Sequence, residues 1–333
     1  MTDASHRLAP VVRLAPAKLN LTLAVVGRRQ DGFHALHSVV LPLALADRLS
    51  LAIRPAGGDT IHVAGADTGP PERNLVLRAI AAVRRAALPE AGDAAAVPPL
   101  AARLEKRIPV AAGLGGGSSD AAAALDGALE VWGVDLAQAA RLAVAAELGS
   151  DVPLFAVGGP ALIEGRGERV TALTGVRGTP VGVLLVTPAI EVPTAEVFAA
   201  LTGGGAAVSP AAGSTRLSSE HLAQELRGGL RSADLVARAG VLAAANDLAA
   251  ATAVVVPGLV PFRRALMRRL ARPVGQSGSG PALWSLYPSL AEAEAAAVVV
   301  RDAVAAGELA APGDGPPSVI ATTTMPSSQE SVP

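Results

Sequence analysis

Four glycines within five residues, in the segment Gly113-Leu-Gly-Gly-Gly117, constrain the fold of this chain more than any other feature. Two serines, an aspartate and an alanine-rich run follow, and this run favours a helix over residues 119–132. Glycine lets backbone N–H groups approach a ligand, and the N-terminus of a helix favours an anion. The segment therefore predicts a phosphate-binding turn. A flexible linker, the other reading, would not need to lead directly into a helix.

Two established phosphate-binding patterns fit this segment poorly. A Walker P-loop requires Lys followed by Ser or Thr after its last glycine, where this chain has Ser118 and Ser119. A Rossmann fingerprint would need a glycine at Ser118 and would close the first strand–helix turn of a parallel sheet. Here a long strand-rich stretch precedes the turn instead, so a dinucleotide-dependent dehydrogenase is the least favoured function.

Hydrophobic periodicity predicts strands and helices that mix without a regular alternation, which favours an α+β class over a doubly wound sheet. We expect strands at 19–26, 39–45, 48–53, 61–63, 100–106, 161–164, 168–173, 181–186 and 282–286, and helices at 74–85, 119–132, 138–148, 194–201, 220–229, 232–238, 246–254, 258–270 and 290–306. Residues 87–98 and 202–219 are expected as loops. The predicted organisation is two domains, 1–176 and 177–311, with a disordered Pro/Ser/Thr-rich tail at 312–333.

Composition excludes several classes of function. The chain of 333 residues has no cysteine, which excludes disulfide scaffolds, zinc ribbons and thiol nucleophiles. The 28 Lys and Arg residues nearly cancel the 29 Asp and Glu residues, so neither a nucleic-acid partner nor a membrane surface is expected. The positive mean hydropathy reflects alanine content rather than an uninterrupted apolar span. We expect a soluble cytoplasmic protein, and make no prediction about protein partners.

Three segments together resemble a known family. Residues 109–122 read Pro-Val-Ala-Ala-Gly-Leu-Gly-Gly-Gly-Ser-Ser-Asp-Ala-Ala, residues 15–21 read Ala-Pro-Ala-Lys-Leu-Asn-Leu, and residues 276–281 read Gln-Ser-Gly-Ser-Gly-Pro. In order and spacing they resemble the three motifs of the GHMP kinases. The resemblance implies a two-domain GHMP kinase fold of the α+β class with the active site in the cleft between domains. It also implies ATP as the phosphate donor, together with Mg²⁺.

Further segments resemble one branch of that family. They are residues 27–34, Gly-Arg-Arg-Gln-Asp-Gly-Phe-His, residues 148–155, Leu-Gly-Ser-Asp-Val-Pro-Leu-Phe, and residues 192–198, Val-Pro-Thr-Ala-Glu-Val-Phe. The branch phosphorylates the 2-hydroxyl of a small molecule, cytidine diphosphate-linked methylerythritol, in non-mevalonate isoprenoid synthesis. Phe33 stands where the branch usually has Tyr. Two alternatives stay open: another GHMP kinase, acting on homoserine or mevalonate, and a non-catalytic binding protein of this fold.

The resemblance also implies site residues. Asp151 would be the catalytic base, and Lys18 would orient it and the hydroxyl. Residues implied in ATP binding are Asn74, Pro109, Gly113, Leu114, Gly115, Gly116, Gly117, Ser118 and Ser119, with Ser118 or Ser119 as a possible Mg²⁺ contact. Residues implied in substrate binding are Asn20, Phe33, His34, Thr194 and Phe198. The third glycine motif supplies Ser277, Gly278, Ser279 and Gly280.

Several of these residues have a second reading. Asn74 could instead cap the helix that follows it, and Asp120 could be either a metal ligand or a first-turn aspartate favoured by the helix dipole. The spacing of His34 and His37 is compatible with one face of a helix, although two imidazoles alone are weak evidence for a metal. A valine at Gly116 is expected to enter the space that phosphate needs.

Overall fold

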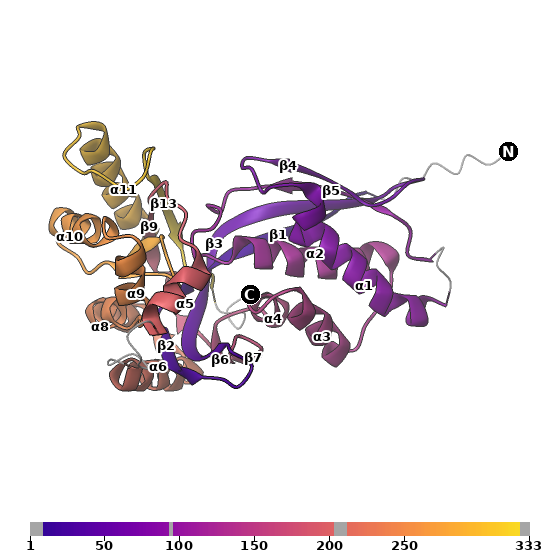
Figure 1. The fold of residues 1–333 in the computed structure, drawn as a ribbon, viewed down its shortest axis with the longest axis horizontal. Coiled ribbons are helices and arrows are strands. Elements are labelled where there is room, and N and C mark those ends of the chain that lie inside the picture. The colour runs from indigo at the N-terminus through magenta and orange to yellow at the C-terminus, as the bar shows by residue number, and fades with distance from the viewer. Residues whose placement is uncertain (1–8, 93–95, 203–211, 327–333) are drawn as a thin grey trace. The chain divides into compact units, whose positions relative to one another are not determined.

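The computed structural model describes residues 9–92, 96–202 and 212–326 (Figure 1). Contacts between Cα atoms divide the chain into two units. Unit 1 comprises residues 1–16, 46–110 and 116–157, and unit 2 comprises residues 17–45, 111–115 and 158–333. The boundary predicted at residues 176–177 differs from this division. Residues 36–40 pair with residues 161–165 in an antiparallel ladder, and this pairing joins two distant parts of the chain in unit 2.

Unit 1 combines strands with a helical layer. Its strands are the first residues of β1 (Val11–Asn20), the second half of β3 (His34–Ile53), β4 (Thr60–Ala64) and β5 (Leu100–Glu105). Strand β5 pairs antiparallel with β3 and parallel with β4. The helices are η1 (Pro71–Arg73), α1 (Leu75–Ala91), α2 (Gly116–Trp132), α3 (Gln138–Leu148) and α4 (Val152–Val157).

The core of unit 1 depends on small side chains. Helix α2 buries a continuous alanine run, from Ala121 to Ala124, together with Leu125. This run belongs to the same buried cluster as Ile80 of α1 and Leu51 of β3. Because alanine lets neighbouring elements approach closely, α2 lies directly beside α1, as Figure 1 shows. The close packing holds the first turn of α2 in place.

Unit 2 contains two groups of paired strands. In the first, β2 (Ala24–Arg28), the first half of β3, β6 (Ala161–Gly165) and β7 (Arg169–Ala172) are antiparallel. The second is an antiparallel sheet in the order β11 (Gly275–Gln276), β12 (Leu283–Tyr287), β9 (Gly182–Thr187) and β13 (Ser318–Thr323). Two short strands, β8 (Val176–Arg177) and β10 (Leu230–Arg231), pair in parallel.

Helices cover these strands. They are α5 (Thr194–Thr202), α6 (Ala212–Arg227), α7 (Ser232–Ala237), α8 (Ala239–Ala244), α9 (Leu248–Val255), α10 (Leu259–Leu270) and α11 (Leu290–Ala305). Helix α11 packs on β9 and β13, and α5 packs on α9 (Figure 1).

The prediction of a disordered tail from residue 312 is wrong for residues 312–326. Strand β13 pairs with β9 residue by residue, from Ser318 opposite Thr187 to Thr323 opposite Gly182. Thr324 then accepts a hydrogen bond from Val181 N–H at 3.1 Å through its hydroxyl. The segment has few large apolar residues, so its order depends on partners that are distant in the sequence. Residues 327–333 lie outside the described part of the chain.

Three other predictions need correction. The expected loop at 202–219 contains the start of α6 at Ala212, while residues 203–211 lie outside the described part. Helix α1 continues to Ala91, into the expected loop at 87–98, despite Pro89. The two strands expected at 39–45 and 48–53 are one strand, β3. Asp47 lies between the two predicted ranges, and its fully buried carboxylate is held by hydrogen bonds.

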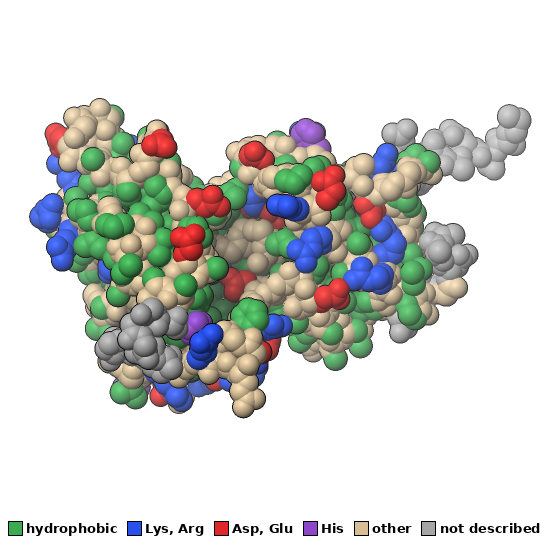
Figure 2. All heavy atoms as spheres, viewed as in Figure 1, with side chains coloured by type: hydrophobic (Ala, Val, Ile, Leu, Met, Phe, Trp, Pro, Cys, Tyr) green, Lys and Arg blue, Asp and Glu red, His purple; other side chains and the backbone are tan. Residues whose placement is uncertain are grey.

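No single helix among the described residues is long and apolar enough to cross a membrane. Helices α9 and α10 meet that length and composition only as a pair, and the pair is bent by 118°. On the face shown in Figure 2, Arg and Lys side chains are interspersed with Asp and Glu side chains over unit 1. This mixture agrees with the net charge of −1.

Candidate active site

The first glycines of the segment form a turn, and the later ones begin a helix. Gly113 and Gly115 have φ values of 78° and 72°, in the left-handed region that favours glycine. At Gly113, a Cβ atom would lie 2.4 Å from the carbonyl oxygen of Ser277, so no larger residue fits there. The carbonyl oxygen of Leu114 accepts a hydrogen bond from Lys18 N–H at 2.9 Å. Within unit 2, the first glycines therefore connect the first and third motifs.

The remaining glycines begin helix α2 in unit 1. The helix begins at Gly116, so the free N–H groups of its first turn lie in the glycine and serine segment. Ser119 in this turn and Asp120 directly after it are buried, and neither Ser119 Oγ nor Asp120 Oδ1 has a hydrogen-bond partner. Buried polar atoms usually have a partner. Two orphan oxygen atoms at a helix N-terminus therefore indicate a place where a ligand completes the bonding.

The expected reason for glycine at position 116 is wrong. A Cβ atom there would not point outward toward a phosphate. It would lie 3.1 Å from Ile108 Cγ2 and 3.2 Å from Lys106 Nζ, both inside unit 1. Gly116 is also not among the described residues with positive φ. A side chain at this position would therefore act by displacing the lysine that lies behind the turn.

Lys106 is part of a buried charge cluster behind the first turn of α2. Its Nζ donates to Asp120 Oδ2 at 2.7 Å and to Asp47 Oδ2. The other oxygen of Asp47 accepts the N–H groups of Arg107 and Ile108, at 2.5 and 2.9 Å. Burial is the main cause that raises the pKa of Asp120 to about 7; the Lys106 ammonium opposes this rise and the Asp47 carboxylate adds to it. Asp120 follows the first turn of α2, which contains no acidic residue, so the interpretation as a first-turn aspartate is wrong, and its carboxylate is instead tied to a lysine.

Lys18 and Asn20 form the equivalent polar centre of unit 2. The Lys18 ammonium donates to Asn20 Oδ1, and Asn20 Nδ2 donates to Ser38 Oγ at 2.9 Å. Ser277 Oγ donates to Gly113 O at 3.0 Å and to Asn20 Oδ1 at 3.4 Å. Both Lys18 and Asn20 are buried. The Asn20 side chain, implied in substrate binding, thus orients Lys18 through hydrogen bonds that the structure already contains.

The third glycine motif is held by residues for which the sequence suggested no role. Asn246 Nδ2 donates to the carbonyl oxygens of Gln276 and Gly278, at 3.0 and 2.9 Å. Thr252 Oγ1 lies 3.1 Å from the carbonyl oxygen of Ser279. The hydroxyls of Ser279 and Thr194 lie 2.9 Å apart. This network brings Thr194, the first residue of α5, to the third motif.

Two aromatic rings stack where the sequence implied a pyrimidine site. The His34 and Phe198 ring centroids lie 4.9 Å apart, with an interplanar angle of 20°. His34 Nε2 is buried without a hydrogen-bond partner. Burial, and to a smaller degree the Arg28 charge, lower the pKa of His34 from its ordinary value. A neutral imidazole with an unfilled ring nitrogen can donate to or accept from a ligand.

Phe33 directly precedes His34 in the sequence, and it is half exposed, at 51%. The Arg166 guanidinium lies over its ring, 5.4 Å from the centroid. The Phe33 N–H donates to Asp31 Oδ1 at 3.1 Å, and Arg29 pairs with both Asp31 and Glu168. The turn that carries Phe33 is therefore fastened to the β6–β7 hairpin that carries Arg166.

The helical interpretation of the histidine pair is wrong. His34 and His37 both lie in strand β3, where residues three apart point to opposite faces. His37 Nδ1 lies 2.9 Å from Ser219 Oγ, on α6, whereas His34 stacks on Phe198 of α5. Among the residues that the structure describes, no group of three or more His, Asp or Glu residues could hold a metal ion.

Asn74 caps helix α1, as in the second of the two interpretations given for it, ATP binding or helix capping. Its Oδ1 accepts the Val76 N–H at 2.9 Å, and its Nδ2 donates to Thr68 Oγ1 at 3.1 Å. Asp151 lies between α3 and α4, within the turn that Val152 N–H closes with a 3.2 Å hydrogen bond to Gly149 O. Asp151 is half-buried in unit 1, and Lys18 belongs to unit 2.

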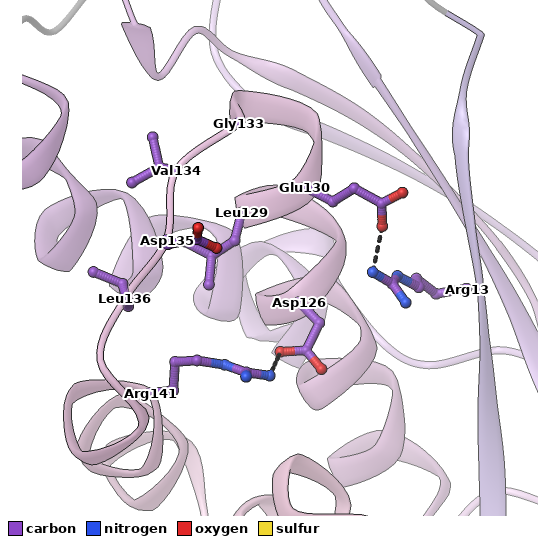
Figure 3. A pocket seen from close by; sticks show the side chains of 9 residues that line it. All are labelled: Arg13, Asp126, Leu129, Glu130, Gly133, Val134, Asp135, Leu136 and Arg141. Carbon is purple, nitrogen blue, oxygen red and sulfur yellow. Dashed lines mark hydrogen bonds and ion pairs between the residues drawn. The ribbon is translucent and has the colours of Figure 1, made fainter.

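A cavity of about 510 Å³ lies near the other end of α2. Figure 3 shows Arg13 directed at Glu130, and Arg141 directed at Asp126. Glu130 is 14 residues from Gly116, which corresponds to about 21 Å along a helix. Because each guanidinium in the cavity is paired with a carboxylate, its charge is already offset. The glycine turn, not this cavity, has the features of a phosphate site.

Comparisons with known proteins show the family to which the chain belongs. A family model described as GHMP kinases N terminal domain matches residues 74–159. The 4-diphosphocytidyl-2-C-methyl-D-erythritol kinase of Pelotomaculum thermopropionicum is 38% identical over 291 residues, which cover 87% of this chain and 94% of the relative. The relative of the same name in Deinococcus radiodurans is 38% identical over 299 residues, covering 89% and 91%.

Solved structures give the same result. A crystal structure of 4-(cytidine 5'-diphospho)-2C-methyl-D-erythritol kinase has a TM-score of 0.66 at 31% identity, covering 94% of this chain and 98% of that one. Homoserine kinase from Cytophaga hutchinsonii has a TM-score of 0.68 at 17% identity, covering 97% of each chain, and is similar in fold alone. The fold and the glycine turn thus define a two-domain α+β kinase, as predicted. The chain belongs to the GHMP kinases and, within them, to the family of the 4-diphosphocytidyl-2-C-methyl-D-erythritol kinases.

Sequence reasoning missed Asp47 and Thr252, and it found that residues 246–248 match the family without giving Asn246 a role; all three residues hold the motifs in position. It also found no role for Lys106. One signal was available: the chain has only two lysines among 28 basic residues. Where arginine serves for general surface charge, each remaining lysine deserved a search for a compact buried ammonium.

Proposed function

We propose that this protein transfers the γ-phosphoryl group of ATP to the 2-hydroxyl of 4-diphosphocytidyl-2-C-methyl-D-erythritol, in non-mevalonate isoprenoid synthesis. The observation that carries the proposal is the match to the two kinases of that name over about nine-tenths of both chains. The stacked rings and the glycine turn support it. The products are ADP and the phosphorylated alcohol.

The glycine turn is the proposed phosphate site. Free N–H groups at the start of α2 would donate to phosphate oxygens, and the helix dipole favours the negative charge. Gly117 is exposed and Ser118 half-buried, which leaves both accessible to a nucleotide. Asn74, Pro109 and the rest of the glycine segment are proposed as further nucleotide contacts.

Magnesium chemistry fits this turn. Mg²⁺ prefers oxygen ligands and is usually held by one or two protein groups together with the phosphates of the nucleotide. Ser119 Oγ and Asp120 Oδ1 are buried oxygens without partners, so they are the proposed protein ligands, with Ser118 beside them. A bound Mg²⁺ would offset negative charge on the transferring phosphate.

Proton transfer is assigned to Asp151. Its carboxylate would accept the hydroxyl proton as the oxygen attacks the γ-phosphorus in line, while the bond to ADP breaks. The Lys18 ammonium, oriented by Asn20, would favour the developing alkoxide by electrostatic attraction. These two roles rest on the motif positions of the residues and on their chemistry.

The aromatic residues of unit 2 are the proposed cytosine site. Arg166 covers one face of the exposed Phe33 ring, and the ring also offers a surface for an aromatic base. The unfilled Nε2 of His34 can bond the polar edge of a pyrimidine. Thr194 and Phe198 on α5 would complete this site.

The proposal is tested by measuring ADP release from ATP with a panel of alcohols. The panel contains the cytidylylated methylerythritol, homoserine and mevalonate, each with wild-type protein and with Asp151→Asn. We expect rapid, Asp151-dependent turnover only with the cytidylylated alcohol. Faster turnover with homoserine or mevalonate would assign the protein to another kinase activity. ATP binding without turnover of any alcohol would indicate a binding protein.

A further inference from the structure

The buried Lys106 cluster lies at the place where negative charge is least expected. The proposed phosphate site is the first turn of α2, yet Asp120 follows directly after that turn, and Asp120 and Asp47 both bond Lys106. The side chains of Lys106, Asp47 and Asp120 are 3%, 0% and 5% exposed. Charges buried in this way interact more strongly than charges in water. Two unbalanced carboxylates here would repel a polyphosphate.

The Lys106 ammonium lies where it reduces this repulsion. Lys106 Nζ bonds one oxygen of each carboxylate and lies 3.2 Å from the position of a Cβ atom on Gly116. A positive charge is therefore directly behind the backbone that begins α2. The Lys106 N–H also donates to Ala64 O at 2.8 Å, so strand pairing fixes the root of the side chain.

We propose that Lys106 is a positioning residue of the phosphate site, acting on nucleotide phosphates through charge rather than through contact. Its ammonium offsets one of the two negative charges of Asp47 and Asp120, and it holds the start of α2 through Asp120. The free N–H groups of the first turn therefore meet the phosphates against a weaker negative field than two carboxylates alone would produce. This inference rests on the proposed function only in that the turn binds a nucleotide.

An electrostatic role and a merely structural role predict different results. Charge–charge repulsion grows with the number of phosphates, whereas a distorted turn would weaken all nucleotides similarly. We therefore compare dissociation constants of adenosine, AMP, ADP and ATP by calorimetry, in EDTA. Without Mg²⁺, the measurement reports the field of the protein itself, and it needs no turnover.

The first variant is Lys106→Met, which keeps the length of the side chain and removes the charge. We expect ATP affinity to fall at least tenfold, ADP affinity to fall less, and adenosine affinity to stay within twofold. Equal weakening of all four ligands would overturn the proposal. If wild-type protein bound no nucleotide at all, the proposed function would fail first, and the two failures are thereby distinguished.

Removing one partner of a buried ion pair can prevent folding, so a second variant is needed. The combination Lys106→Met, Asp47→Asn and Asp120→Asn removes all three charges, and an amide oxygen at position 47 can still accept the two backbone N–H groups. We expect this variant to recover ATP affinity to within about threefold of wild type. If it folds and still loses ATP in preference to adenosine, charge balance is not the role of Lys106. Asp135→Asn, an exposed change at the far end of α2, is the control.

Discussion

The chain has two lysines, one in each unit, and both are buried, but their partners differ. Lys106 in unit 1 is held by the carboxylates of Asp47 and Asp120. Lys18 in unit 2 donates to the amide oxygen of Asn20. The two carboxylates orient the Lys106 ammonium and oppose its charge, and the Asn20 amide orients the Lys18 ammonium, which has a further interaction as well. Burial of a lysine therefore does not define its role, and the chemistry of its partners is more informative.

The same contrast extends to the surrounding polar groups. The first turn of α2 in unit 1 is built over buried formal charges. The third motif in unit 2 is held by neutral hydrogen bonds, from Asn246, Thr252 and Ser277. Neutral networks depend on geometry and respond weakly to salt, whereas charge clusters act over longer distances. If the contrast reflects function, changes to the charges of unit 1 should alter nucleotide affinity, and changes to the polar groups of unit 2 should alter the reaction of the alcohol.

The largest expected effect separates the lysine of unit 2 from that of unit 1. Lys18→Ala and Asp151→Asn should each lower kcat by about 10²–10⁴-fold, the usual contribution of a positioned acid–base group. ATP affinity should stay within about threefold, in contrast to Lys106→Met. Steady-state kinetics and calorimetry on the same preparations provide the comparison. Either variant keeping more than half of wild-type kcat would contradict the assignment.

The next prediction concerns the stability of unit 2, which contains β13. Truncation before Pro312 removes β13, and with it the pairing to β9 and the bond from Val181 N–H to Thr324. We expect the Tm to fall by several degrees or more, because each kcal/mol lost shifts the Tm of such domains by roughly 2–4 °C. Scanning calorimetry measures the change.

The matched control for this truncation ends the chain after Pro326 and keeps every contact of β13. Its Tm should stay close to that of the full chain. Equal destabilisation by the two truncations would show that β13 contributes little to the sheet.

A smaller effect is expected at the exposed ring of Phe33. Phe33→Ala should raise the KM for the cytidylylated alcohol by about tenfold, since an aromatic stack contributes roughly 0.5–1.5 kcal/mol beyond burial. The KM for ATP should not change, and Phe33→Tyr should be tolerated. Arg166→Ala should raise the same KM less, because an exposed cation–π contact contributes about 0.5–1 kcal/mol.

Arg169→Ala, on the neighbouring strand β7, is the control for Arg166, because Arg169 is exposed and pairs with Glu164. Parallel KM titrations for ATP and for the alcohol distinguish the outcomes. If Phe33→Ala weakened both substrates equally, the ring would be a packing residue and the cytosine site would be elsewhere.

The smallest effect is a pH dependence. Burial lowers the pKa of His34 from its ordinary value of 6.5. The neutral form is therefore the one favoured by the fold, and its contribution is present above 6.5 and is lost as pH falls through the lowered pKa. We expect the KM for the alcohol to rise on that acid side, and His34→Gln to remove the rise. A rise that persists in His34→Gln would assign the titration to another group.

The sequence by itself predicted the parts that depend on local pattern. Helices α2 and α3 follow from alanine-rich, periodic segments, and α3 was predicted at its observed bounds. The turn before α2 followed from glycines next to a helix start, and phosphate binding by this turn stays a prediction. The positive φ values of Gly113 and Gly115 give the physical reason for two of those glycines.

Only the tertiary structure decided the features that depend on distant partners. Strand β3 was predicted as two strands, 39–45 and 48–53, and Asp47 lies between them. A buried carboxylate is unfavourable unless it is paired, and the partner of Asp47, Lys106, is 59 residues away. The tail was predicted to be disordered, because the strand that orders it by pairing, β9, is distant in the sequence. The spacing of His34 and His37 was compatible with one face of a helix, but both residues lie in the paired strand β3, where they point to opposite faces. Local pattern determines which elements a segment can form, whereas burial and pairing across the chain determine which charges, rings and strands are brought together.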